Sequence, residues 1–143
     1  EELNKDSYVA IARDDIQFVL KVPRKIKKYL HHYSIKHHQQ KLYAPGVLAI
    51  CIVAILKKKK LSPARLEIDI EYPGHEEKVI EIIKLHNKQI DVTFRQIGKH
   101  SPAHLAAYSS SRKRKTPVIP IIEGTAADLH PEFTGIRTRT RSN

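Results

Sequence analysis

Residues 65–98, RLEIDIEYPGHEEKVIEIIKLHNKQIDVTFRQIG, have the clearest periodicity in this chain and decide its predicted fold. In the first part of this stretch apolar residues and acids alternate, which predicts a β-strand with one apolar face and one acidic face. The apolar face consists of Leu66, Ile68, Ile70 and Tyr72, and the acidic face consists of Glu67, Asp69 and Glu71. Pro73 and Gly74 then end the strand.

A helix is predicted to follow this strand. Glu76 and Glu77 fall in its first turn, where the helix dipole favours acids. One side of the helix is apolar and carries Val79, Ile80, Ile82, Ile83 and Leu85. Residues 90–97 alternate again as a strand. Because the connecting loops are short, the two strands are predicted to be parallel and joined by a right-handed crossover.

The first segments of the chain predict a hairpin and a helix. Residues 7–12 and 16–22 are β-rich runs separated by a polar turn, as in an antiparallel hairpin. Pro23 can open a helix over residues 24–41. Its predicted buried side carries Ile26, Tyr29, Leu30 and Tyr33, and its predicted basic outer face carries Arg24, Lys25, Lys27 and Lys28.

The remaining segments complete an α/β domain. Residues 44–46 (APG) are expected to break the chain, and the apolar run that follows them, residues 47–56, reads as a buried helix or a buried strand. A last helix is expected from Pro102, and an edge strand over residues 116–122. Together these elements predict a single three-layer domain over residues 1–133 with one mixed sheet. Residues 134–143 read as a basic C-terminal tail.

The composition indicates an anionic partner. The 143 residues include 26 Lys and Arg against 15 Asp and Glu, a net charge of +11. We therefore expect RNA or DNA as the partner, since phosphates attract basic residues whatever the base sequence. A basic protein without a nucleic-acid partner is the alternative. Four clustered basic residues follow the last helix: Arg112, Lys113, Arg114 and Lys115.

The sequence carries no sign of secretion or of a membrane partner. Cys51 is the only cysteine, which excludes an intrachain disulfide. No signal peptide is visible at the first residues. The longest apolar run, residues 46–56, is shorter than the roughly 20 residues that a bilayer-spanning helix needs. A cytoplasmic location is therefore expected.

The acidic face of the first strand is the sharpest candidate for chemistry. Asp69 and Glu71 lie nearest its carboxyl end, where open α/β sheets place their sites. Carboxylate oxygens there would hold Mg²⁺ or Mn²⁺, which activates water and clamps a phosphodiester. The alternative is an amphipathic strand whose acids pair with neighbouring Lys and Arg.

A second polar group follows the next strand, in the loop before the last helix. A parallel neighbour brings this loop beside the end of the acidic strand, where His100 can transfer a proton and Lys99 can contact a phosphate. A loop of polar capping residues explains Gln96, Lys99, His100 and His104 equally well. Two histidine pairs of the basic helix, His31 with His32 and His37 with His38, are more typical of a solvated face than of a metal site.

The order of hairpin, helix, acidic strand, helix, strand and helix resembles the ribonuclease H-like fold. The resemblance rests on LEIDIEYPG and GKHSPAHLAAY, over residues 7–111. It implies a metal-dependent nuclease in which Asp69, Glu71 and His100 are catalytic. The family's first strand, which carries its principal aspartate, has no clear counterpart in this sequence.

Two functions therefore remain open. The first is an Mg-dependent nuclease. The second is a non-catalytic nucleic-acid-binding or protein-interaction module. The nuclease hypothesis places Lys99 and His100 near the scissile phosphate. The binding-module hypothesis places phosphate contacts on the basic helix, with Lys25 and Lys28, and on residues 112–115.

Overall fold

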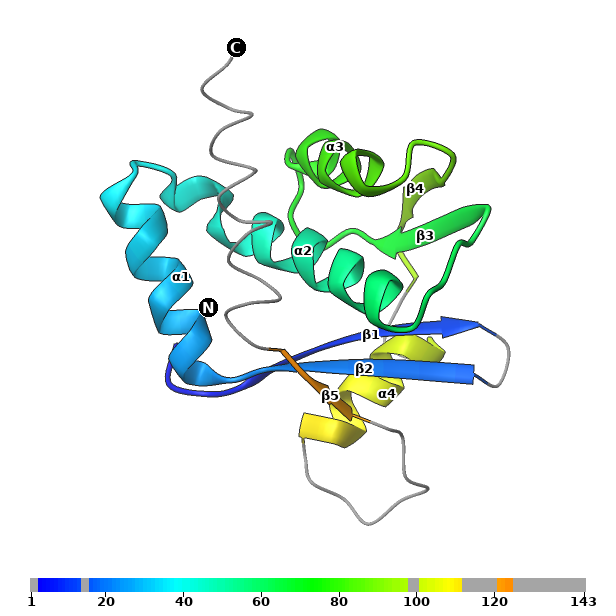
Figure 1. The fold of residues 1–143 in the computed structure, drawn as a ribbon, viewed down its shortest axis with the longest axis horizontal. Coiled ribbons are helices and arrows are strands. Elements are labelled where there is room, and N and C mark those ends of the chain that lie inside the picture. Colours follow the sequence, from blue (N-terminus) through cyan, green and yellow to red (C-terminus); the bar gives the residue numbers. More distant parts are fainter. Residues whose placement is uncertain (1–2, 14–15, 98–100, 112–120, 125–143) are drawn as a thin grey trace.

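A computed structural model of the chain describes residues 3–13, 16–97, 101–111 and 121–124 (Figure 1). The predicted basic tail, residues 134–143, lies outside the described residues. The fold is mixed α/β, as the sequence predicts. The prediction of one mixed sheet is wrong, because the described strands form two small sheets.

The larger sheet has the strand order β1-β2-β5. Strands β1 (Ser7–Arg13) and β2 (Ile16–Val22) form the predicted antiparallel hairpin, in which Arg13 is paired with Ile16 at the turn. Strand β5 (Ile121–Glu123) pairs with β2 in parallel. It overlaps the last two residues of the edge strand predicted over residues 116–122 and extends one residue beyond it.

The smaller sheet is the predicted strand–helix–strand unit. Strands β3 (Arg65–Asp69) and β4 (Asp91–Arg95) are parallel, and α3 (Glu76–His86) connects them. The alternation in β3 is confirmed, since Leu66 and Ile68 are buried while Glu67 is exposed.

The predicted strand is too long, because β3 ends at Asp69 and Glu71 lies beyond it. The last pairing bond to β4 joins the Ile70 amide to the Arg95 carbonyl at 3.2 Å. The chain then turns at Gly74, whose positive φ of 90° suits a residue without a side chain. The Glu76 carboxylate accepts a hydrogen bond from the Gly74 amide at 2.8 Å, so this turn is also held by a side chain.

The central helix, α2 (Tyr43–Lys58), follows α1 (Arg24–Lys36) and a short 3-10 turn, η1 (Gln40–Leu42). The expected break at residues 44–46 is wrong, because this segment forms the first turn of α2. Pro45 is tolerated there since the first helical residues need no backbone donor. The structure also decides the open choice for residues 47–56 in favour of a helix.

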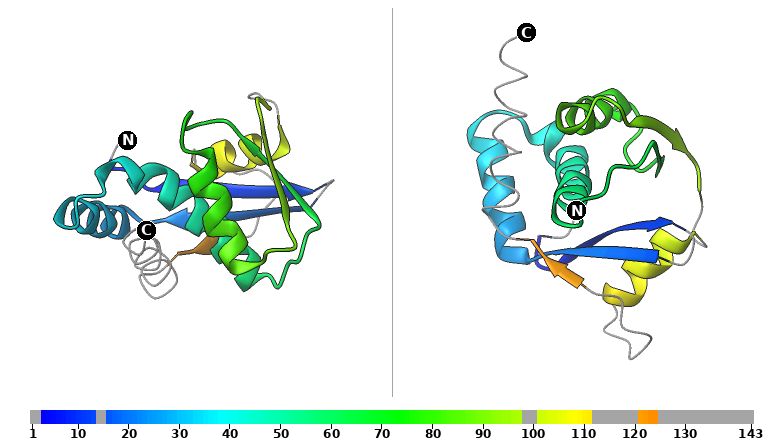
Figure 2. Two further views of the ribbon diagram at one scale, coloured as in Figure 1. Left: turned by 90° about the horizontal axis from the view of Figure 1, so that it is seen from above. Right: turned by 45° about the vertical axis from the view of Figure 1, so that its right-hand side comes forward.

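Helix α2 is the core of the protein, and Ile50, Cys51, Val53 and Ile55 have no exposed surface. It contacts the hairpin on one side and α3 on another, while α4 (Pro102–Ser111) packs against β1 and β2 (Figures 1 and 2). Helix α1 stands at the end of the molecule away from β3 and β4, so much of its surface faces solvent.

The helical segment of residues 40–58 is long and apolar enough to cross a membrane by length and composition. The sequence estimate was shorter because it counted only the uninterrupted apolar run. In the structure 67% of the apolar window is buried inside the protein. A core helix passes the same test, so the segment is weak evidence for a membrane span.

Asp6 closes the amino end of α1 although it lies on the segment before β1. Its carboxylate accepts a hydrogen bond from the Arg24 amide at 2.9 Å, and the Lys21 amine lies 3.7 Å from it. The hydrogen bond from Arg24 is the main cause that lowers the Asp6 pKa below its usual 3.8, and the Lys21 charge adds to it. Folding therefore stabilises the ionised form of the Asp6 carboxyl relative to its protonated form.

Asp6→Ala is expected to lower the free energy of unfolding at pH 7 by about 1 kcal/mol, the usual contribution of a helix cap. Because the folded pKa is depressed, this contribution is present above pH 3.8 and is lost as the pH falls through the folded value. Urea unfolding between pH 7 and pH 3 measures the difference.

Asp6→Asn is the matched control, since its amide oxygen still accepts the Arg24 hydrogen bond but does not titrate. It should keep most of the stability at pH 7. An Asp6→Ala defect of equal size at every pH would contradict the assigned role of the carboxylate charge.

Candidate functional site

The outer face of α1 carries a row of exposed basic residues. The buried face of this helix is formed by Lys27, Leu30 and Ser34. The exposed residues therefore lie on the opposite side. They are Arg24, Lys25, Lys28, Tyr29, His32, Ile35 and Lys36.

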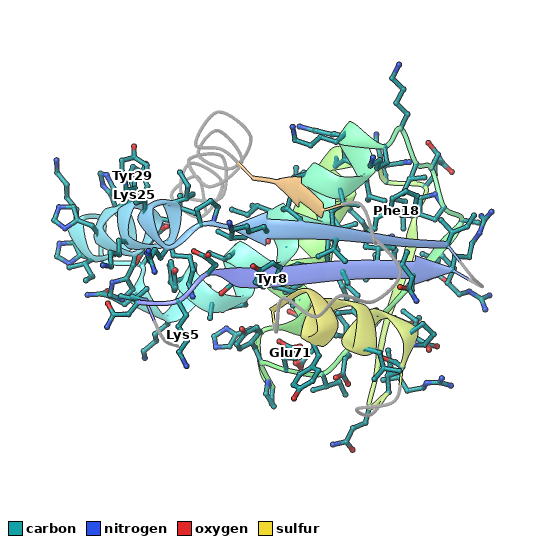
Figure 3. The ribbon with its side chains drawn as sticks, turned by 90° about the horizontal axis from the view of Figure 1, so that it is seen from below. Lys5, Tyr8, Phe18, Lys25, Tyr29 and Glu71 are labelled. Atoms are coloured by element: carbon teal, nitrogen blue, oxygen red, sulfur yellow. The ribbon has the colours of Figure 1, made fainter. Side chains whose placement is uncertain are left out.

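Four of these exposed residues form one stripe along the helix. Lys25, Tyr29, His32 and Lys36 follow one another at intervals of about one turn, a spacing that places side chains on one helix face. Lys25 and Tyr29 project side by side from α1 in Figure 3. We call these four residues, together with Lys28, the α1 stripe.

Tyr29 departs from its predicted position. The sequence placed it on the buried side with Leu30 and Tyr33, but 47% of its surface is exposed. The helical spacing of Lys25, Tyr29 and Lys36 in the sequence also allows Tyr29 to lie on the basic face, and this was the signal for its observed position. An exposed tyrosine between lysines offers an aromatic ring for base stacking beside charges for phosphates.

The α1 stripe has no acid near it in the sequence. No aspartate or glutamate occurs between Asp15 and Glu67, so α1, η1 and α2 contain none. The lysines of the stripe consequently have no intrahelical ion pairs. Asp6, at the amino end of α1, is bonded to the Arg24 amide and does not belong to the stripe.

Lys27 is not part of the basic face, contrary to the prediction. It is only 2% exposed, and its amine donates a hydrogen bond to the Lys5 carbonyl at 3.0 Å. The Lys27 carbonyl accepts a hydrogen bond from the Tyr43 hydroxyl at 3.2 Å. Lys27 thus joins the chain before β1 to α1, and its methylene stem packs inside.

The acids of β3 take part in several contacts. The Glu67 carboxylate lies 3.0 Å from the Arg95 guanidinium on β4, and Arg65 lies 3.8 Å from Asp91. Asp69 Oδ1 accepts a hydrogen bond from the Ile97 amide at 3.0 Å. For Glu67 this arrangement agrees with the alternative reading, an amphipathic strand whose acids pair with neighbouring Lys and Arg, whereas the hydrogen bond to Asp69 comes from a backbone amide.

A cavity of about 790 Å³ opens beside β3. Its walls are the hairpin, α2, β3 and α4, and most of the lining side chains are apolar. Asp69 and Glu71 both line this cavity, so the structure brings the two candidate metal ligands to one space. Glu71 reaches it from the loop after β3 and not from the strand.

The described part of the chain contains no group of three His, Cys, Asp or Glu side chains that could hold a metal ion. Lys99, His100 and residues 112–115 lie outside the described residues, and the side chain of His104 is likewise not described. Of the helix histidines, His31 packs edge-on against Tyr43 and His37 packs against Tyr33, with ring centroids 5.0 and 4.3 Å apart.

Comparisons of the chain with protein-family models, curated proteins and solved structures find no match. The assignment of a function therefore rests on the residues and contacts described above.

Proposed function

We propose that the protein binds single-stranded nucleic acid, either RNA or unpaired DNA, through the α1 stripe. Lys25, Lys28 and Lys36 contact successive phosphates, and Tyr29 stacks on a base. The observation that carries the proposal is the exposed tyrosine between lysines on a segment without acids. Such a combination of charge and aromatic surface is what sequence-tolerant single-strand binding uses.

The tyrosine separates this proposal from simple charge attraction. Tyr29→Ala is expected to weaken binding to a fluorescein-labelled single strand by roughly 5- to 150-fold, which corresponds to about 1 to 3 kcal/mol for one stacked base. Binding to a duplex of equal length should change little, because the bases of a duplex already stack on one another and leave no free face for the tyrosine ring. Fluorescence anisotropy at fixed salt measures both.

Tyr29→Phe is the matched control for this substitution. It keeps the ring and removes only the hydroxyl, so it should bind the single strand nearly as the wild type does. Equal losses for single strand and duplex in Tyr29→Ala would contradict stacking.

The second candidate function is a metal-dependent nuclease of the ribonuclease H-like type. This proposal includes the three-layer architecture predicted from the sequence. The observation in its favour is that Asp69 and Glu71 line one cavity. In this reading the two carboxylates hold Mg²⁺ or Mn²⁺, His100 transfers a proton, and Lys99 and residues 112–115 contact phosphates.

Cleavage of labelled RNA, DNA and hybrid substrates with and without Mg²⁺ tests the nuclease proposal. The double variant Asp69→Asn with Glu71→Gln is expected to abolish metal-dependent cleavage. The asparagine oxygen can still accept the Ile97 hydrogen bond, so the fold should persist. Binding through the α1 stripe should remain in this variant, which distinguishes the two proposals. Cleavage that survives the substitutions would exclude the two acids as metal ligands.

A further inference from the structure

The outer edge of β1 presents backbone hydrogen-bonding groups to the cavity. The Lys21 carbonyl accepts a bond from the Gly124 amide at 2.7 Å, so Lys21 faces β5 and its neighbour Leu20 faces β1. Leu20 is paired with Val9, which therefore faces β2. Because neighbouring residues of a strand direct their backbone groups to opposite sides, every second residue of β1 faces away from β2. These residues are Tyr8, Ala10 and Ala12.

The outer edge of β3 is oriented in the same way. The Ala64 carbonyl accepts a bond from the Asp91 amide at 2.9 Å, and the Ile70 amide donates to Arg95, so even-numbered residues face β4. The odd-numbered residues direct their N–H and C=O groups away from β4. They are Arg65, Glu67 and Asp69.

The two outer edges border the same cavity. All six residues with outward-facing backbone groups line it, and the Leu48 and Ile52 side chains of α2 contribute to another wall. In the described part of the chain, β1 and β3 each pair with a strand on one side only. In the view of Figure 1, β1 points to the right and β3 to the left, and Figure 2 shows that β3 is also inclined to β1. A strand between them that is antiparallel to β1 is therefore parallel to β3.

We propose that this cavity is a slot for one extended segment of a partner polypeptide. The segment pairs with β1 on one edge and with β3 on the other, and joins the two small sheets into one with the order β5-β2-β1-segment-β3-β4. Strand addition supplies the partners that exposed strand edges lack, and this is a common mode of peptide recognition. β1 is 7 residues long and β3 is 5 residues long, which sets the length of the segment.

The cavity lining specifies the side chains of the segment. Alternate residues face Leu48 and Ile52, so they are apolar and β-branched. Arg13 and Arg65 lie where β1 ends and β3 begins, while Asp69 and Glu71 lie at the opposite end of β3. A segment parallel to β3 consequently matches these charges with an acid at its first residue and a base at its last.

A synthetic peptide, Ac-Glu-Val-Thr-Val-Thr-Val-Lys-NH₂, added to the full 143-residue chain tests the slot. Amide hydrogen exchange by NMR is expected to slow at least about tenfold at both edges, at Tyr8, Ala10, Ala12, Glu67 and Asp69. Val92 and Phe94, whose amides face the outer edge of β4, are the internal control and should not change. No binding up to about 1 mM peptide, or slowing at only one edge, would overturn the proposal.

Two N-methylated peptides decide whether both edges are used. The valine amides point to one edge of the peptide and the threonine amides to the other. Methylation of either set should reduce affinity at least about tenfold, because each removes hydrogen bonds that the slot requires. Loss with only one set would indicate addition to a single edge and would overturn the slot.

Two further outcomes concern the identity of the occupant. A peptide with its terminal Glu and Lys exchanged should bind at least about tenfold more weakly at low salt, and equal binding would overturn the charge-matched direction.

A second copy of the chain as occupant would protect the same amides without peptide, and the protection would increase with chain concentration. Dimerisation in sedimentation velocity together with that protection would overturn the partner assignment.

Discussion

Replacing Lys25, Lys28 and Lys36 by glutamine is expected to weaken binding to single-stranded RNA about a hundredfold at 0.1 M salt. Each lysine that contacts a phosphate releases condensed counterions, and on single strands each contact adds about 0.7 to the slope of log K against log salt. Loss of three contacts should therefore reduce the slope by about 2 as well as the affinity. Anisotropy titrations at several salt concentrations measure both quantities.

A second triple variant with the same net charge is the control. Lys59, Lys84 and Lys88 are exposed on other parts of the molecule, at the end of α2, in α3 and before β4. Their replacement by glutamine should leave both affinity and salt slope close to the wild-type values. Equal losses in the two variants would mean that net charge, and not the α1 stripe, attracts the nucleic acid.

Ile50→Ala is expected to lower the free energy of unfolding by about 2 to 5 kcal/mol, enough to unfold much of a marginally stable domain. Ile50 is fully buried in α2, where the hairpin and the β3–α3–β4 unit both depend on this helix for a packing surface. The substitution removes buried methyl groups and leaves a cavity that a helix held on two sides cannot close. Urea unfolding followed by circular dichroism measures the loss.

Leu85→Ala provides a matched comparison on α3, because 55% of the Leu85 surface is exposed. Its effect should stay within about 0.5 kcal/mol, as for most surface substitutions. A small effect of Ile50→Ala would contradict the assignment of α2 as the common core of the two sheets.

The parts of the fold that were predicted correctly depend on local patterns. The alternation of β3 and the helical spacing of α3 are read directly from neighbouring residues, and the short connections require parallel pairing. The hairpin and the start of α1 after Pro23 were recognisable for the same reason.

The errors occurred where distant residues decide the outcome. Residues 44–46 contain both proline and glycine, yet they lie in the first turn of α2, where the core buries Pro45 and Gly46. In the sequence Lys27 looks like a surface lysine, but in the structure it is buried and its amine donates a hydrogen bond to the Lys5 carbonyl. Glu71 continues the alternation of β3, but pairing with β4 ends before it.

The candidate sites were predicted in part. Lys25 and Lys28 are exposed on α1 as expected, whereas Tyr29 was assigned to the wrong face because helical spacing alone does not show how the helix is rotated. Asp69 and Glu71, the predicted metal ligands, both line one cavity. The hydrogen bond from the Ile97 amide to Asp69 could not be predicted from the sequence, because these residues meet only through the parallel pairing of β3 with β4.

The sequence by itself determined the α/β class, the parallel β3–α3–β4 unit and the strongly basic charge, because each follows from composition or from contacts between near neighbours. Only the tertiary structure decided that β3–β4 and the hairpin form separate sheets with a cavity between them. It also decided which residues of α1 face outward. The reason is that sheet edges and helix rotation depend on packing around α2, to which segments far apart in the chain all contribute.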